Sequence, residues 1–388
     1  AGRVGRQRTQ RWVCNRRLPP WIVGVDNARA LAAVAADASL IVEQRVLRYG
    51  IACDYNRCGV VDATLRYTRA TAVGIERAQQ AAVEHNKKWG TRLEVRDPRA
   101  VTSCSRYCET VLDLDGATLQ PMDYTLGLAR SLCGAAGGQA HLFEGSLVTR
   151  VSAREAGGWE VETSAGGRVG ARAVVMCGGP VLPVLPPTSD TPYTARPLAA
   201  LAAATIPLYT YILTTPPVPR HLRERAFTLP ISDARHAGNY YRWLPDGRLL
   251  FGGLFHARPA AHDADLHNAA SALLDELCRL YPDPELQAYW RADTCWGGEM
   301  AYARHMMPLL GEALPGLYYA TAFGGHGIVP TAAAGEVLAS AILDSDGKGH
   351  SMLRVFETHF PPANSYGMLG RAVASLRLTW LRLYKEAW

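Results

Sequence analysis

The stretch that decides the fold is Leu317-Tyr-Tyr-Ala-Thr-Ala-Phe-Gly-Gly-His-Gly-Ile-Val-Pro330. Its first five residues predict a strand, and Pro330–Leu343 predicts a helix. Glycines between a strand and a helix let the backbone approach a ligand closely, and Pro330 suits a first helical turn because no N–H is needed there. The helix N-terminus would present N–H groups and a partial positive charge to an anion. Taken alone, the spacing lacks the third glycine of a dinucleotide fingerprint, and a tight structural turn explains it equally well.

The remainder of the chain interleaves strands and helices. Helical patterns cover 28–49, 66–89 and 122–133, and strand patterns cover 139–143, 159–163, 169–176, 208–215 and 248–251. Turns are predicted at 165–167 and 245–247. This alternation predicts an α/β protein, and the antiparallel strands in its middle predict a second domain inserted into the first.

Composition excludes several classes of protein. The chain has 388 residues, of which 48% are hydrophobic and 20% charged, enough for two domains with a large core. Its net charge of +6 comes from six arginines before Asp26, because the remaining 35 Lys and Arg equal the 35 Asp and Glu. We therefore expect no nucleic-acid partner, and a cytoplasmic enzyme acting on a small molecule.

Neither a membrane span nor a metal site is expected. Leu198–Thr215 carries no charge and reaches the lower length limit of a spanning helix, but Pro207 and the Thr- and Tyr-rich half after it indicate a strand. Nine cysteines, an odd number without a Cys-x-x-Cys pair, indicate a reducing compartment and ordinary buried thiols.

Several segments, in their order and spacing, resemble the FAD-dependent amine and amino-acid oxidases of the D-amino-acid oxidase superfamily, most closely the γ-glutamylputrescine oxidase-like branch. The resemblance covers the chain from about Val25 onward. The segments are Arg48-Tyr-Gly-Ile-Ala-Cys-Asp-Tyr55, Leu119-Gln-Pro-Met-Asp-Tyr124, Ala173-Val-Val-Met-Cys-Gly-Gly179, Tyr240-Tyr-Arg242, Arg248-Leu-Leu-Phe-Gly-Gly253, Met300-Ala-Tyr-Ala-Arg-His-Met-Met-Pro308 and Gly324-Gly-His-Gly327.

The resemblance implies the cofactor FAD and two groups of residues that hold it. A strand ending near Leu147 and Val148 would lie beside the adenine, and Cys177, Gly178 and Gly179 would let the chain pass close to the dinucleotide. The second group would face the flavin pyrimidine and consists of Gly324, Gly325, His326, Gly327 and Ile328. We expect no metal.

The resemblance also implies the substrate-facing residues. Tyr240, Tyr241 and Arg242 would come from the substrate domain, and Arg304, His305 and Met307 from the loop that enters the flavin pocket. A carboxylate-bearing substrate needs an arginine fork, for which Arg242 and Arg304 are the candidates. An ion pair is an equally good account of each arginine, and His305 and His326 fit structural roles equally well.

The implied fold is a two-domain FAD-dependent oxidoreductase, with a Rossmann-like FAD domain and a mixed or antiparallel substrate domain. The FAD domain would comprise 1–50, 136–186 and 305–388, and the substrate domain 51–135 and 187–304. The implied reaction transfers a hydride from the carbon beside an amine to flavin N5, and oxygen then gives hydrogen peroxide. The alternatives are an amino-acid dehydrogenase that uses another acceptor, and a non-catalytic remnant that retains only ligand or partner binding.

The N-terminus departs from the family pattern. Members begin with a βαβ unit that carries Gly-x-Gly-x-x-Gly and cradles the FAD pyrophosphate, and the sequence printed here lacks it. Arg6–Cys14 instead matches, at all nine positions, a shifted reading frame of the family run Gly-Ala-Ser-Gly-Arg-Asn-Gly-Gly-Phe-Val. We therefore expect a truncated and frameshifted chain that is colourless and inactive when purified. A transit peptide or a nucleic-acid arm would explain the arginines but not this match.

Overall fold

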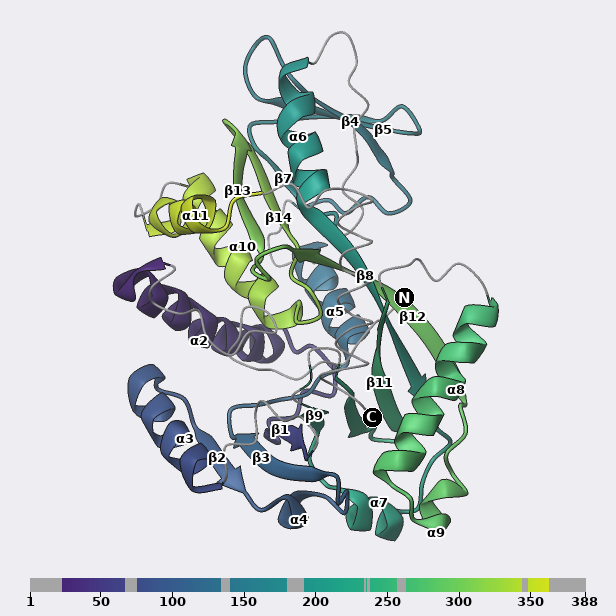
Figure 1. The fold of residues 1–388 in the computed structure, drawn as a ribbon. Coiled ribbons are helices and arrows are strands. Elements are labelled where there is room, and N and C mark those ends of the chain that lie inside the picture. The colour runs from purple at the N-terminus through teal and green to yellow at the C-terminus, as the bar shows by residue number, and fades with distance from the viewer. Residues whose placement is uncertain are drawn as a thin grey trace.

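The computed structural model describes residues 23–66, 75–133, 140–179, 192–233, 235, 238–256, 263–343 and 348–362 (Figure 1). The stretch Arg6–Cys14 lies outside them. The helices are α2 (Val25–Arg48), α3 (Ile75–Trp89), α4 (Pro98–Val101), α5 (Pro121–Cys133), α6 (Pro192–Ala204), α7 (Arg220–Ala226), α8 (Asp263–Leu280), α9 (Pro284–Gln287), α10 (Ile328–Leu343) and α11 (Lys348–His359). The strands are β1 (Val60–Leu65), β2 (Leu93–Arg96), β3 (Tyr107–Asp113), β4 (Val148–Ala153), β5 (Trp159–Thr163), β6 (Arg168–Ala171), β7 (Val174–Met176), β8 (Thr205–Thr214), β9 (Ile231–Asp233), β10 (Tyr240–Trp243), β11 (Leu249–His256), β12 (Thr294–Ala303), β13 (Leu309–Leu314) and β14 (Leu317–Thr321).

The largest sheet has eight strands in the order β12-β8-β11-β10-β9-β1-β3-β2. Its pairs are antiparallel except β1 with β9, so it is the mixed sheet that the sequence predicts. All its strands come from 51–135 and 187–304, the segments assigned to the substrate domain. The domain boundaries themselves stay a prediction.

Two three-stranded sheets come from the other segments. One has the order β13-β14-β7, in which β7 runs parallel to β14, and the other is the antiparallel β4-β5-β6. Helices α2, α10 and α11 pack beside the first of them, on the left of Figure 1. Their shared core contains the apolar face of α2, the alanine-rich face of α10 and Phe356 of α11.

A buried chain of hydroxyl groups fixes the inner face of the large sheet. Tyr241 of β10 bonds the hydroxyls of Tyr107 at 3.0 Å and Tyr281 at 3.1 Å, and Tyr281 bonds the hydroxyl of Thr102 at 2.8 Å. Burial raises the pKa of all three tyrosines, which keeps them neutral. These bonds tie β10 to β3 and to the end of α8.

A buried ionic cluster fixes the loop that leads into β10. Arg235 donates to Asp233 at 2.6 Å and to Glu276 of α8 at 3.1 Å, and Asn239 donates to the same Glu276 at 3.2 Å. Burial disfavours the charge of Arg235, but the two carboxylates outweigh that effect and raise its pKa. These bonds connect the loop before β10 to Asp233 of β9 and to Glu276 of α8.

Most predicted elements are confirmed, with shifted ends. The helices predicted over 28–49, 122–133 and 330–343 are α2, α5 and α10, and α3 covers 75–89 of the helix predicted over 66–89. The strands predicted over 159–163, 208–215 and 248–251 are β5, β8 and β11, and the strand over 317–321 is β14. Turns follow β5 and precede β11, as predicted.

Two strand predictions are wrong. Residues 169–176 form two strands, because the chain leaves β5 after Ala171 and pairs with β14 from Val174 onward. Residues 140–143 are not a strand, and no strand of the described part of the chain pairs with them. Leu142 and Phe143 are 60% and 69% exposed, so neither hydrogen bonding nor burial stabilises an extended strand there.

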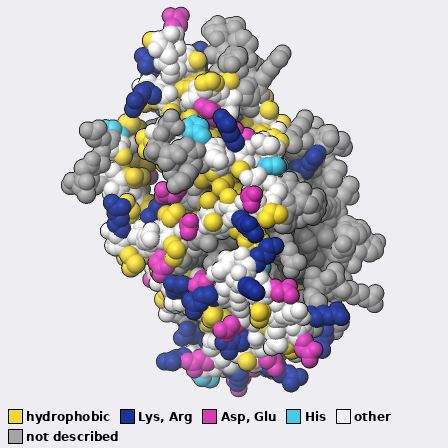
Figure 2. Space-filling model, turned by 90° about the vertical axis from the view of Figure 1, so that its left-hand side faces the viewer, with side chains coloured by type: hydrophobic (Ala, Val, Ile, Leu, Met, Phe, Trp, Pro, Cys, Tyr) yellow, Lys and Arg dark blue, Asp and Glu magenta, His cyan; other side chains and the backbone are white. Residues whose placement is uncertain are grey.

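The uncharged stretch 198–215 is divided between α6 and β8. Among the described residues, no helix has the length and apolarity to cross a membrane. Figure 2 shows basic and acidic side chains interspersed on the face that carries α2, α3 and α11. The described charges on this face therefore do not gather into the one-sign field that attracts a polyanion.

Candidate functional site

Two glycine-containing loops leave the same edge of the β13-β14-β7 sheet. Because β7 and β14 are parallel neighbours, the loops that follow them start at adjacent carboxyl ends, where α/β proteins bind ligands. The hydroxyl of Thr321 donates to the carbonyl of Gly179 at 2.8 Å and ties the loops together. Gly179 and Gly324 have φ of 62° and 60°, which glycine adopts without strain. The structure thus brings Cys177–Gly179 and Gly324–Ile328 to one sheet edge.

The end of β12 holds the second loop in place. The N–H of Gly324 donates to the carbonyl of Ala301 at 2.8 Å, and the N–H of Gly325 donates to the hydroxyl of Tyr302 at 3.1 Å. Ala322 has φ of 60° although it carries a side chain, which costs about 1–2 kcal/mol. Such strain collects at ligand sites because the surrounding contacts must enforce it.

The N-terminus of α10 follows this loop directly. The carbonyl of Gly327 accepts from both the N–H and the hydroxyl of Thr331, at 2.9 and 2.6 Å. The helix begins at Ile328, two residues before the predicted start, so Pro330 is its third residue. The first four N–H groups of a helix have no partner within it, so Pro330 still removes no helical hydrogen bond.

Strand β10 projects Tyr240 and Arg242 from one face, because side chains alternate along a strand, and Tyr241 from the other. The Tyr240 hydroxyl lies 3.2 Å from that of Thr210. The Tyr240 ring covers Gly252 so closely that a side chain there would collide with it. The Tyr240 ring is therefore packed closely on this face of the sheet.

Arg242 is a buried cation with unused hydrogen-bonding capacity. It is 7% exposed, donates to the carbonyl of Leu119 at 3.1 Å, and its Nε is buried without a partner. Within the described part of the chain Arg242 forms no ion pair. Burial lowers its pKa, against the opposing effects of the Cys58 thiol and the Asp54 carboxylate.

Arg304 and His305 lie in the turn after β12. Arg304 is exposed and, among the described residues, has no ion pair. His305 packs on Phe360 with ring centroids 5.4 Å apart, and its Nδ1 accepts from the N–H of Met307 at 3.2 Å. Burial lowers the pKa of His305, opposed by the carbonyls of Pro361 and Phe360. The Nε2 of His305 is buried and has no hydrogen-bond partner among the described residues.

The prediction that a strand ends near Leu147 and Val148 is wrong, because β4 begins at Val148. Val148 pairs with Thr163, and the carbonyl of Leu147 accepts from the N–H of Ser164 at 2.8 Å. The β5 hairpin is close in sequence and satisfies these backbone groups, which explains the difference. These backbone partners of Leu147 and Val148 belong to 163–164 and not to the glycine loops.

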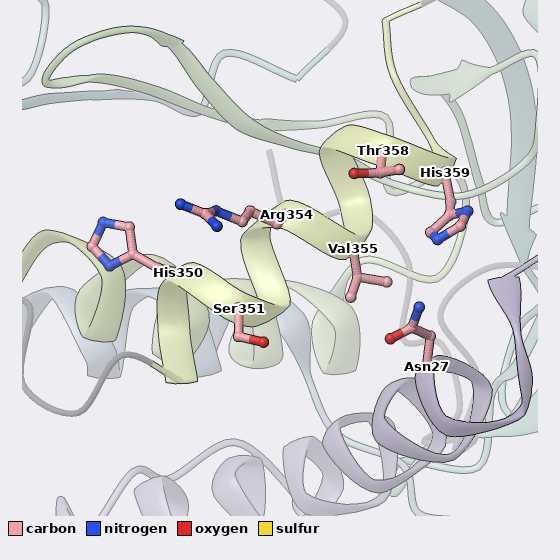
Figure 3. Close-up of a pocket in the computed structure, with 7 residues that line it drawn as sticks. All are labelled: Asn27, His350, Ser351, Arg354, Val355, Thr358 and His359. Atoms are coloured by element: carbon pink, nitrogen blue, oxygen red, sulfur yellow. The ribbon is translucent and has the colours of Figure 1, made fainter.

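A separate cavity of about 440 Å³ lies between α11 and the start of α2 (Figure 3). Asn27 of α2 faces Val355 and His359 of α11 across it. The described residues that line it are Asn27, His350, Ser351, Arg354, Val355, Thr358 and His359. None of the predicted site residues lines this cavity.

Known proteins match this chain over most of its length. The family model described as DAO, FAD dependent oxidoreductase, matches residues 7–341. The chain belongs to the DAO family of FAD-dependent oxidoreductases.

Individual relatives of this DAO-family chain are distant. Gamma-glutamylputrescine oxidoreductase of Escherichia coli is 25% identical over 91% of this chain and 78% of its own length. Two solved structures share the fold at 18% identity. Glycine oxidase from Geobacillus kaustophilus has a TM-score of 0.62 over 81% of this chain and 80% of its own, and L-proline dehydrogenase from P. horikoshii has 0.63 over 87% and 83%. They confirm the α/β, two-domain type of fold that the sequence implies.

The FAD that the family requires fits the two glycine loops. Among the described residues, no atom lies within 4 Å of a Cβ built at Gly179 or Gly327, so these residues leave open space beside both loops. A planar ring system can approach the backbone there, with the N-terminus of α10 facing its anionic edge. The residues that would cradle the pyrophosphate in a βαβ unit are not among those described.

Sequence reasoning missed several residues of this site. Leu119 stands in a motif that carries the family resemblance, but no local pattern indicates that its carbonyl accepts a hydrogen bond from Arg242. Tyr302 contributes a hydroxyl that accepts from the N–H of Gly325, and Ala322 contributes a positive φ angle before the glycine loop. A sequence pattern reveals neither, because both depend on segments that are distant in the chain.

Proposed function

We propose that this DAO-family chain oxidises the C–N bond of an amine that also carries a carboxylate, that is, an amino acid, with dioxygen as the electron acceptor and hydrogen peroxide as a product. The family supports the flavin-dependent oxidation of an amine or amino acid. The choice of a carboxylate-bearing substrate rests on Arg242.

The buried guanidinium of Arg242 carries this proposal. Taking a cation out of water costs several kcal/mol unless a partner compensates it. Among the described residues, Arg242 has one carbonyl partner and an Nε donor without a partner, so these contacts offset that cost only in part. A carboxylate would accept two parallel hydrogen bonds from the guanidinium. Arg304 is the weaker candidate, because its exposed charge is already hydrated.

The residues of this chain position the substrate. Arg242 would hold the carboxylate, and the rigid Tyr240 would restrict the carbon chain beside it. The loops at Gly179 and Gly324–Gly327 would hold the flavin ring, and Arg304 would stand at the solvent side. When bound, FAD accepts the hydride from the carbon next to the neutral amine. His305 would remain neutral and keep the turn after β12 packed on α11.

The experiment supplies FAD to the purified chain and offers it amino acids together with amines of the same carbon skeleton. With FAD supplied, we expect turnover of the amino acids with production of peroxide, and this result would contradict the prediction from the sequence that the purified chain is inactive. Reduction of a dye without peroxide would favour the dehydrogenase alternative. Ligand binding without turnover would favour the non-catalytic alternative.

The colour of the purified protein is a separate measurement. The sequence predicts a colourless preparation, and a stoichiometric yellow flavin spectrum would contradict that prediction. Sequencing the coding DNA checks the frameshift, because the codons of Arg6–Cys14 must yield the glycine-rich run in another frame.

A further inference from the structure

The cavity between α11 and the start of α2 lies against one face of α11. Six residues of the helix line it in two neighbouring rows, because residues four apart stand on the same side of a helix. One row is His350, Arg354 and Thr358, and the other is Ser351, Val355 and His359. The opposite face of α11 is buried in the core that it shares with α2 and α10. The cavity is therefore built on the side of α11 that is turned away from the core.

Asn27 supplies the opposite wall of the cavity from α2. Its Nδ2 donates to the carbonyl of Val23 at 2.9 Å, and Figure 3 shows its side chain across from Val355 and His359. Helices α2 and α11 pack on the same core, which fixes the distance between the two walls. The volume of about 440 Å³ is within the range of about 300–1,000 Å³ that small-molecule sites occupy. A water molecule takes up about 30 Å³, so the cavity has room for a molecule with a carbon skeleton.

The described lining of the cavity offers hydrogen-bond donors and a positive charge. Arg354 carries that charge and forms no ion pair within the described part of the chain. No aspartate or glutamate is among the described lining residues. The carboxylate of α11, that of Glu357, instead accepts from the N–H of Glu312 in β13 at 2.8 Å. An anion in the cavity would therefore meet a guanidinium and no described carboxylate.

We propose that this cavity binds a small molecule with a phosphate group between α2 and α11, and that Arg354 is the main contact of the phosphate. The planar fork of an arginine matches two phosphate oxygens. The hydroxyls of Ser351 and Thr358 and the imidazole of His359 are further donors on the same helix face. A phosphate offers three acceptor oxygens to such a set, whereas a carboxylate offers two. The site uses neither Arg242 nor the glycine loops, so it is independent of the proposed function.

Three probes of similar size test the ligand class. Glycerol 3-phosphate carries the phosphate, glycerate carries a carboxylate instead, and glycerol carries no charge. Their dissociation constants are measured by calorimetry on the purified chain in a chloride buffer, without and with added FAD. We expect glycerol 3-phosphate to bind more tightly than glycerate, glycerol not to bind, and added FAD to leave the affinity for glycerol 3-phosphate unchanged.

The Arg354→Gln substitution removes the charge and keeps a side chain of similar length. One charge-assisted contact at a partly exposed site corresponds to about five- to tenfold in affinity, and we expect glycerol 3-phosphate to bind more weakly by that factor. Arg77→Gln is the matched control, because Arg77 is also an exposed helical arginine, in α3, that forms no ion pair within the described part of the chain. It should leave the affinity unchanged.

The Asn27→Asp substitution tests the opposite wall. It places a carboxylate in the first turn of α2, where the helix dipole favours a negative charge, and that carboxylate should repel a phosphate in the cavity. We expect at least about fivefold weaker binding of glycerol 3-phosphate. Asn27→Leu is the control, because it removes the same hydrogen bond to the Val23 carbonyl without adding a charge, and it should weaken binding less. Urea unfolding of each variant checks that a loss of binding is not a loss of the fold.

Four results would overturn the inference, and none of them bears on Arg242. The first is a chain that does not bind glycerol 3-phosphate, or binds glycerate as tightly. In the second, Arg77→Gln weakens binding as much as Arg354→Gln does, so the effect is one of overall charge. The third is displacement of glycerol 3-phosphate by FAD, which would place the phosphate at the flavin site. The fourth is an Asn27→Asp protein with unchanged affinity, which would place the phosphate outside the cavity.

Discussion

The substitution Arg242→Met should make the protein more stable and its carboxylate binding weaker. Methionine has a similar length and no charge, so it can fill the position occupied by the buried side chain. If a residue stabilises the fold, replacing it should lower the free energy of unfolding. If a residue binds a ligand at a cost to the fold, replacing it should raise the free energy of unfolding.

The magnitude follows from the contacts of Arg242. The variant loses one hydrogen bond of the guanidinium to the Leu119 carbonyl, which contributes about 1.5–3 kcal/mol. It also removes a cation that is 7% exposed and unpaired, and such burial costs several kcal/mol. Replacing a buried ion pair by apolar residues of similar volume is often neutral or stabilising, by about 1–4 kcal/mol, and Arg242→Met likewise removes a buried charge. The lost bond puts our expectation near the lower end, a gain of about 1–2 kcal/mol in the free energy of unfolding.

The assay has two parts, urea unfolding for stability and calorimetry with hexanoate for binding. Losing a charge-assisted fork of about 1.5–3 kcal/mol corresponds to roughly ten- to hundredfold weaker binding. Arg242→Lys is the control, because it keeps a buried cation and loses the fork; it should weaken binding without the gain in stability. A less stable Arg242→Met protein with unchanged hexanoate affinity would refute the reasoning and make Arg242 a structural residue.

Three further predictions concern the core, the pH response and the flavin loops. Tyr241→Phe breaks two buried hydroxyl contacts and should lower the free energy of unfolding by about 1–3 kcal/mol in urea melts, whereas Tyr49→Phe at an exposed position should change it little. His305 has a lowered pKa, so it takes up protons more readily when unfolded, and stability should fall as the pH drops below about 6.5. In His305→Asn, which keeps an acceptor for the Met307 N–H, unfolding curves from neutral to acidic pH should show a smaller fall. Gly327→Val should leave the melting temperature nearly unchanged but weaken FAD binding in a fluorescence titration, because it fills open space, and Gly335→Ala within α10 should leave FAD binding intact.

The α/β alternation and the glycine loop at 324–327 could be predicted from sequence because each depends on residues that are close along the chain. Hydrophobic spacing gave α2 and α5 to within three residues, and strand composition gave β5 and β14 with their exact ends. The wrong predictions, at 140–143 and 169–176, concern strands whose existence depends on a partner. A strand is stabilised by its neighbour, so local composition alone cannot say which segment will pair.

The candidate site shows the same division. Arg242 and the glycines were named from motifs, but only the fold shows that Arg242 is buried, with no ion pair to another described residue, while Arg304 is exposed. Likewise, Thr321 and Gly179 stand more than a hundred residues apart in the sequence, and they meet because β7 and β14 are parallel neighbours.

The sequence by itself determined the membership in a flavin-dependent family, the α/β alternation of the segments with a clear local pattern, and the residue types available for binding an anion. It did so because backbone propensity and glycine geometry are local properties. The tertiary structure alone decided which charge is desolvated and which donors remain without a partner among the described residues. Those properties arise from burial and from pairing between distant segments, and they turn an ordinary arginine into a candidate substrate anchor.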